Sequence, residues 1–195
     1  MGENFLVTFI GSVVFVVTGC CAITDLFYRK IFNVVTYPAF LTVVGFNVLW
    51  SLGLLGPSTR YGAIGIRESI GGAFCCFIIT LLPYIMVCGG AGDAKLGAVI
   101  GAALGVAYGV TTVFVSFVFA GVCVVVFLLW EKGPFFLVAM LYHQIGHFVL
   151  PLWIAPPTEE QKKISRVPFP LGPSFFLGVL FVVSGLFERW IGVQL

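Results

Sequence analysis

The sequence has very few charged residues for a chain of 195 amino acids. Only 9% of them are Asp, Glu, Lys or Arg, whereas 60% are hydrophobic, and the mean hydropathy is +1.12. Soluble domains carry roughly 25% charged residues, so this composition cannot cover a globule in water. It suits a protein whose surface mostly faces lipid. We therefore predict a single membrane-embedded domain over residues 1–195, with the lipid bilayer as its surroundings.

Clusters of basic residues and C-x-x-C pairs are also absent. The net charge of +2 is scattered along the chain, which excludes a basic block for nucleic acid binding. The six cysteines lie in apolar runs and form no C-x-x-C pair of the kind that binds zinc. We interpret them as small apolar side chains that pack between helices. Residues 1–4 lack Lys and Arg, which argues against a secretory signal peptide.

Long apolar runs predict an all-α polytopic membrane protein of about six transmembrane helices, because backbone polar groups in lipid must be satisfied within the protein. The candidate spans are residues 5–24, 34–56, 69–89, 95–110, 112–130 and 173–191. Glycines recur at every fourth residue of the fourth run, at Gly97, Gly101, Gly105 and Gly109. Such a stripe of small residues lets another helix approach closely, so we interpret it as a packing face.

The distribution of Lys and Arg between these spans predicts that both termini lie outside. One side of the membrane then holds Arg29, Lys30, Lys95, Lys132, Lys162, Lys163 and Arg166, and the other holds Arg60, Arg67 and Arg189. The more basic side is the cytoplasmic one. Residues 134–153 are apolar enough to span, but a seventh span would move three basic residues outside. We expect this segment to be a helix at the cytoplasmic interface, or one that dips into it.

Two carboxylates stand out at the predicted membrane edge. Asp25 lies at the cytoplasmic end of the first span and Asp93 follows the third, so this topology places both at the same depth. Two neighbouring carboxyl groups can share one proton, as the catalytic pair of an aspartic protease does, without a metal or cofactor. The alternatives are an i,i+4 ion pair between Asp25 and Arg29 and a helix-capping role for Asp93.

Three motifs in this order resemble a known family. Gly90-Ala91-Gly92-Asp93 matches the G-x-G-D motif of intramembrane aspartic proteases, and Lys95 makes it similar to the prepilin peptidase version. Residues 25–33 resemble that family's first acid, basic pair and Ile-Pro-Asn, with Phe32 in place of the usual proline. Residues 167–173 resemble the Pro-rich segment before its last helix. The chain looks like a short Tad/Flp-type member of the type IV prepilin peptidase family, without a methyltransferase domain.

This resemblance implies a function and a set of site residues. Asp25 and Asp93 would be the catalytic pair, Gly90 and Gly92 would shape the loop, and the supporting residues would be Lys95, Arg29 and Asn33. The implied partner is a prepilin or pseudopilin, whose short basic leader is cleaved at the cytoplasmic face of the inner (cytoplasmic) membrane by a multi-pass enzyme. The family uses no cofactor. Because Phe32 stands in place of the usual proline, a different path of the chain after the first span is an open alternative.

The sequence allows three other interpretations. A catalytically inactive assembly factor of a pilus or secretion system would keep the same fold, and a small transporter would use paired acids to relay protons. His143 and His147 have the i,i+4 spacing of zinc ligands. However, Gln144 cannot act as the general base of a zinc protease and no third ligand is close in sequence, so we expect no catalytic metal.

Overall fold

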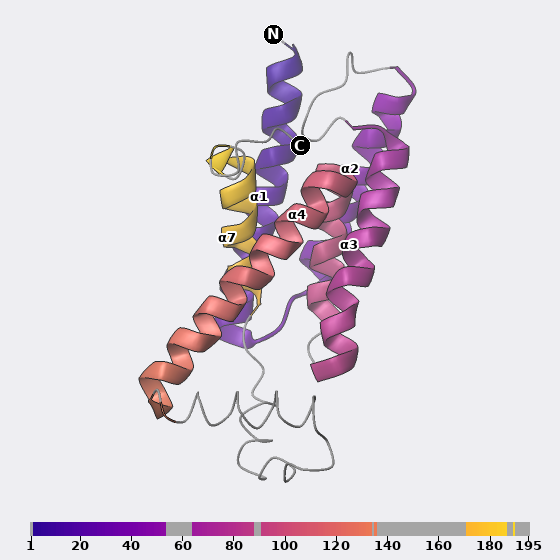
Figure 1. Cartoon of the computed structure of the whole chain (residues 1–195). Coiled ribbons are helices and arrows are strands. Elements are labelled where there is room, and N and C mark those ends of the chain that lie inside the picture. The colour runs from indigo at the N-terminus through magenta and orange to yellow at the C-terminus, as the bar shows by residue number, and fades with distance from the viewer. Residues whose placement is uncertain are drawn as a thin grey trace, which may run out of the picture. The chain divides into compact units, whose positions relative to one another are not determined.

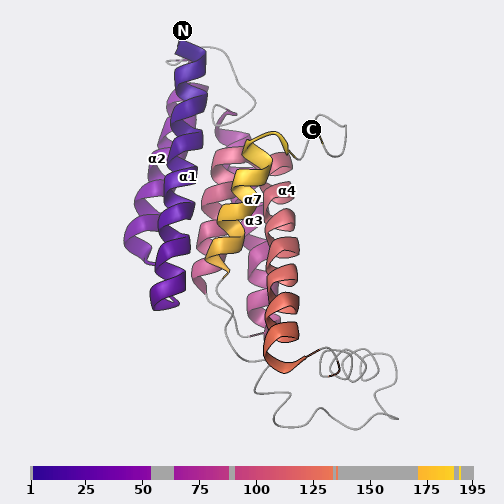
Figure 2. The same cartoon turned by 90° about the vertical axis from the view of Figure 1, so that its left-hand side faces the viewer.

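The computed structural model describes residues 2–53, 64–87, 91–133, 135, 171–186 and 189. Within these ranges every regular element is an α-helix, as the composition predicts (Figures 1 and 2). The helices are α1 (Gly2–Tyr28), α2 (Asn33–Ser51), α3 (Ile66–Val87), α4 (Ala91–Lys132) and α7 (Gly172–Val183). Apart from Phe135, the segment predicted to lie at the interface, 134–153, falls outside the described residues.

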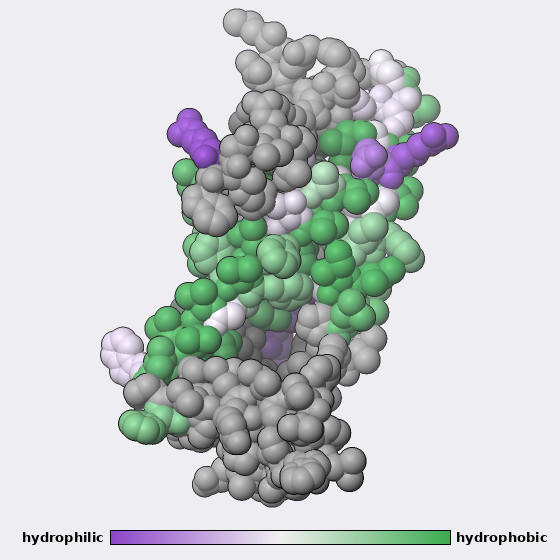
Figure 3. Space-filling view, viewed as in Figure 1, coloured by the Kyte–Doolittle hydropathy of each residue, from purple (hydrophilic) through white to green (hydrophobic). Residues whose placement is uncertain are grey.

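Among the described residues, three stretches are long and apolar enough to cross a membrane, namely Ile10–Tyr28, Asn33–Ser51 and Ala91–Glu131. Helix α7 is also apolar but shorter. Large hydrophobic side chains remain exposed on these helices, and hydrophobic residues dominate the coloured surface in Figure 3. Helices that face lipid have this exposure pattern. The fold is therefore compatible with a membrane protein, while six spans and external termini stay predictions.

A sharp reversal at Gly105 divides α4 into two helical segments. Gly105 has φ 78° and ψ −173°, which no residue inside an α-helix adopts. A Cβ atom on Gly109 would lie 2.9 Å from the Cα atom of Gly101. In a straight helix, residues eight positions apart are separated by about 12 Å along the axis. The predicted continuous span 95–110 is therefore wrong, because the chain turns back at Gly105 rather than after Gly109.

The glycines of this stripe nevertheless pack closely, as predicted. A Cβ atom on Gly101 would collide with the carbonyl group of Gly72 on α3, and one on Gly72 would collide with Gly101 in turn. A Cβ atom on Gly97 would lie 2.7 Å from the side chain of Thr80. The first segment of α4 and α3 thus approach with their backbones in contact, which only residues without a side chain permit.

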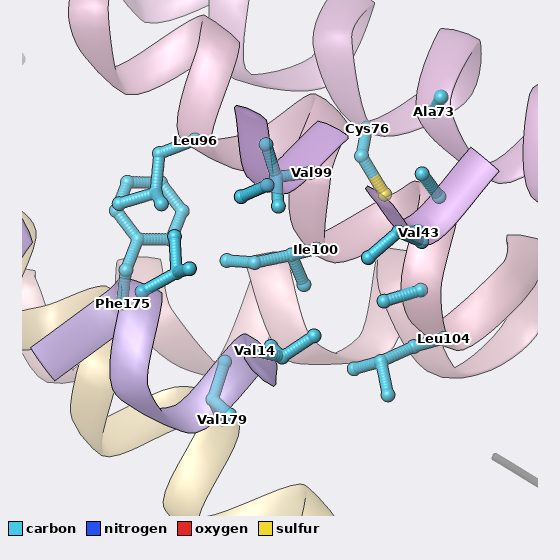
Figure 4. Close-up of a cluster of buried hydrophobic side chains, with 14 of the residues drawn as sticks. Val14, Val43, Ala73, Cys76, Leu96, Val99, Ile100, Leu104, Phe175 and Val179 are labelled. Carbon is cyan, nitrogen blue, oxygen red and sulfur yellow. The ribbon is translucent and has the colours of Figure 1, made fainter. Parts of the chain in front are cut away.

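Residues 1–119 and 170–195 form one compact unit and residues 120–169 a second. The core of the first unit contains side chains from all five helices, as Figure 4 shows. They include Val14, Val43, Ala73, Cys76, Leu96, Val99, Ile100, Leu104, Phe175 and Val179. Cys21 and Cys76 are fully buried, as expected of packing residues, whereas Cys20 and Cys123 are exposed.

Within this unit, one end gathers several helix termini. The end of α1 and the starts of α2, α4 and α7 lie on the same side of the unit (Figures 1 and 2). Along their length α1 and α7 pack together, with the rings of Phe15 and Phe176 4.8 Å apart. This end of the unit contains both aspartates.

Candidate active site

Asp25 occupies the last turn of α1. The helix ends at Tyr28, and Arg29 adopts a left-handed conformation with φ 51° while its N–H donates to the carbonyl oxygen of Asp25 at 2.9 Å. A left-handed residue just past the last turn is a common way to end a helix. Phe32 then has φ −79° and ψ 130°, values that proline also adopts. The missing family proline therefore does not by itself require a different backbone path after α1.

The carboxyl group of Asp25 faces the start of α7. Its Oδ2 accepts a hydrogen bond of 2.7 Å from the N–H of Gly172, and the N–H of Leu171 also interacts with it. The side chain is only 7% exposed. Arg29, one turn further on and just past the end of the helix, acts on it electrostatically. The expected interaction between Asp25 and Arg29 is thus present beside the hydrogen bond from α7.

Asp93 is a neighbour of Asp25 in the fold. It lies in the first turn of α4, is partly buried, and is close enough to Asp25 for a Coulombic interaction between the two carboxyl groups. It is inside the helix and not the residue that precedes it, so a simple N-cap role does not describe it. The fold thus brings together two acids that are 68 positions apart in the sequence.

Gly92 allows the connection between α1 and α2 to lie against the start of α4. A Cβ atom on Gly92 would lie 2.9 Å from the Cβ atom of Ile31, closer than two such atoms come in proteins. Any side chain at this position would push the connection away from Asp93. Gly90, the other glycine expected to shape the loop, lies outside the described residues.

Lys95 and Asn33 form a direct contact. The Lys95 Nζ donates a hydrogen bond of 2.8 Å to the Oδ1 of Asn33, and it lies 5.2 Å from the centroid of the Tyr37 ring. Asn33 and Tyr37 are one turn apart on α2, so a single ammonium group reaches both. Tyr37 was not expected from the sequence, although its i,i+4 spacing from Asn33 placed it on the same helical face.

Gly172 is a second residue that sequence reasoning did not assign to the site. A Cβ atom here would lie 2.9 Å from the Cβ of Asp25 and 3.0 Å from the carbonyl oxygen of Cys21. The local signal was a glycine followed by Pro173 at the start of an apolar helix, a pattern that indicates a helix N-terminus. Nothing in that pattern indicated that the helix would begin against Asp25.

No group of three or more His, Cys, Asp or Glu side chains that could hold a metal ion occurs in the ranges given above. His143 and His147 lie outside those ranges. The described site contains two carboxyl groups and the hydrogen-bond donors around Asp25.

Comparison with known families identifies the same region. The model of the type IV leader peptidase family matches residues 12–125, more than half of the chain, and this segment contains both Asp25 and Asp93. No curated protein and no solved structure matches the chain. The family consists of aspartic-type peptidases that act on prepilin substrates, and its membership agrees with the apolar helices of spanning length. This membrane protein belongs to the type IV leader peptidase family.

Proposed function

We propose that the chain is an aspartic endopeptidase that removes the short basic leader of prepilin-like proteins at the cytoplasmic face of the inner membrane. In this proposal the enzyme is a multi-pass protein with about six spans and both termini outside. The observation that supports it best is the electrostatic interaction between Asp25 and Asp93, which lie at the ends of apolar helices from distant parts of the chain. The family supports peptidase activity in general.

The chemistry follows from the electrostatic interaction between the two acids. Two carboxyl groups that repel each other when both are charged favour a state in which they hold one proton between them. The ionised member can take a proton from a water molecule while the protonated member donates to the scissile carbonyl oxygen. This reaction uses only the two acids and water.

The position of the pair is appropriate for a leader junction. Asp25 lies in the last turn of an apolar helix, and Arg29 and Lys30 follow directly. In a prepilin-like substrate, the basic leader meets the apolar helix at the cleavage point. The change from apolar to basic residues near Asp25 therefore matches the change between basic leader and apolar helix at the cleavage point of the substrate.

The test is cleavage of a co-expressed candidate prepilin by the wild-type protein and by Asp25→Asn and Asp93→Asn variants. We expect both variants to lose cleavage while their amounts in the membrane stay at the wild-type level. Glu68→Gln, which changes an exposed acid on α3, is the matched control and should cleave normally. Detergent-purified protein and leader peptides, analysed by mass spectrometry, locate the bond that is cut.

Cleavage retained by either Asp variant contradicts the proposal. An assembly factor without catalytic activity would behave differently. Its Asp variants would still support pilus or secretion assembly, and the wild-type protein would leave every leader peptide uncut.

A further inference from the structure

The two aspartates have unlike surroundings. The carboxyl group of Asp25 receives backbone N–H groups from the start of α7 and lies near the positive charge of Arg29. In the described part of the chain, no hydrogen-bond donor reaches Asp93, and the charge that acts on it is that of Asp25. Among the described residues, the pair is therefore asymmetric before any substrate binds.

This asymmetry decides which acid carries the negative charge. An N–H group that points at a carboxyl oxygen stabilises the ionised form, and the positive end of the α7 dipole adds to this effect. Asp93 lies in the first turn of α4, whose dipole also favours a negative charge. A direct hydrogen bond to a charged oxygen is the stronger of the two interactions, and only Asp25 has one among the described residues.

We propose that the start of α7 keeps Asp25 ionised and leaves the shared proton on Asp93, so that Asp25 is the base, Asp93 the acid and Gly172 a positioning residue. The proposal rests on the peptidase function proposed above. It adds which acid performs which step, and it assigns a role to α7.

The resulting reaction is balanced in protons. The Asp25 carboxylate takes a proton from water as the water oxygen bonds to the scissile carbonyl carbon, and Asp93 gives its proton to the carbonyl oxygen. The neutral tetrahedral diol then collapses. Asp25 returns its proton to the leaving nitrogen as the C–N bond breaks, and Asp93 takes one back from a diol hydroxyl group. Both acids end as they began, with a carboxylic acid and an amine as products.

Close packing between α1 and α7 explains why a glycine is needed at position 172. With a Cβ atom 2.9 Å from that of Asp25, any larger residue would move the N–H donor away from the carboxyl group. Further along the same helices, a Cβ atom on Gly19 would lie 3.4 Å from the ring of Phe176. Because α7 is held along its length, its start cannot shift without disturbing this contact.

Few other titratable groups lie on the elements around Asp25. On α1 and just after it, Cys21 and Arg29 interact with its charge. Asp93 and Lys95 lie on α4, where Lys95 contacts Asn33. The one titratable side chain of α2 is Tyr37, which faces Lys95, and α7 has none, so its contribution comes from backbone N–H groups.

The experiment is the pH dependence of kcat/KM for a leader peptide with a basic segment, a glycine and an apolar segment. The acidic limb of this profile reports ionisation of the base in the free enzyme. Gly172→Ala weakens the hydrogen bond to Asp25, so we expect the limb to move to higher pH by about one unit. Gly178→Ala is the matched control on the same helix. Its Cβ would collide with Ser116, far along α7 from Asp25, so it should leave the limb unmoved whatever it does to the rate.

If Gly172→Ala does not accumulate, Leu171→Pro replaces the neighbouring N–H donor with the Cδ atom of the proline ring, and Leu171 has φ −86°, near the proline range. We expect the same direction of shift. An unmoved acidic limb in an active variant, or an equal shift in Gly178→Ala, overturns the proposal. That result leaves the peptidase function standing, because Asp25→Asn and Asp93→Asn test it separately.

Discussion

Lys95 and Asn33 are joined by a hydrogen bond of 2.8 Å between the Nζ of one and the Oδ1 of the other. Lys95 is two residues beyond Asp93 on α4, and Asn33 is the first residue of α2. The bond therefore connects the helix of one acid to the chain that follows the other. Within the described part of the chain, neither residue contacts a carboxyl group. The bond therefore favours a positioning role for both.

Lys95→Met and Asn33→Ala should each slow cleavage roughly tenfold, which corresponds to about 1.4 kcal/mol of transition-state stabilisation. Because the two residues form one bond, we expect the double variant to be no slower than either single variant. The measurement is kcat/KM for a leader peptide in a double-mutant cycle. Lys95→Arg keeps the charge and should recover part of the rate, and additive losses would show that the residues act independently.

Gly92→Ala should reduce cleavage at least tenfold while the protein remains folded, an effect of about 1.4 kcal/mol or more. The added methyl group would lie 2.9 Å from the Cβ of Ile31 and would displace the connection between α1 and α2. Gly45→Ala is the control, since a Cβ atom there has no neighbour within 4 Å. Cleavage rates of the purified variants test this, and equal rates for Gly92→Ala and Gly45→Ala would show that the close approach is not needed.

Gly72→Ala and Gly101→Ala should each destabilise the protein by about 3 kcal/mol, at the upper end for an overpacked core. Their added methyl groups would meet backbone atoms of the opposite helix, which cannot move aside as side chains can. The apparent melting temperature in detergent measures the effect. Gly11→Ala, where no atom lies within 4 Å, should melt like the wild type. If both variants melt like the wild type, α3 and α4 can move apart enough to accept the added methyl groups.

Asn47→Ala should destabilise the protein by about 1–3 kcal/mol, because it removes the acceptor of the Ile64 N–H group and one of the two donors to the Ala102 carbonyl. The Asn47 amide is fully buried, donates to the carbonyl oxygen of Ala102 at 3.4 Å and accepts from the N–H of Ile64 at 3.2 Å. Ser69 donates to the same Ala102 oxygen at 2.8 Å. The reversal at Gly105 interrupts the helix just after Ala102, so its carbonyl group needs these donors.

Thermal unfolding in detergent provides the measurement for Asn47→Ala as well. Thr111→Ala is the control, because it removes a hydroxyl group whose hydrogen bond to the Ala107 carbonyl is exposed and local. If the Asn47→Ala variant melts at the same temperature as the Thr111→Ala variant, the bond from Ser69 is sufficient for the Ala102 carbonyl and the Ile64 N–H group has another acceptor.

The sequence alone predicted the all-helical class of fold and indicated the two acids as candidates. Long apolar runs with few charges predict lipid-facing helices. The positions of the charges between these runs predict that Asp25 and Asp93 lie at the same depth in the membrane. The G-x-G-D motif then indicated the family. These inferences depend on local composition and on helix length, which are properties that a linear sequence carries in full.

The glycine stripe on α4 shows where local patterns become ambiguous. Four glycines at regular spacing are compatible with a packing face and also with a break in the helix. Gly101 packs against α3 and Gly105 reverses the chain, although both belong to the same repeat. Their neighbours in space differ, and the spacing contains no information about those neighbours.

Only the tertiary structure decided how the two acids differ. Gly172 is 147 positions from Asp25, yet its N–H is the donor that reaches the carboxyl group. By itself the sequence determined that two carboxyl groups lie at the end of apolar helices. Which of them receives hydrogen bonds depends on where α7 begins against α1, and that is set by the packing of side chains from distant segments, such as Phe15 on Phe176.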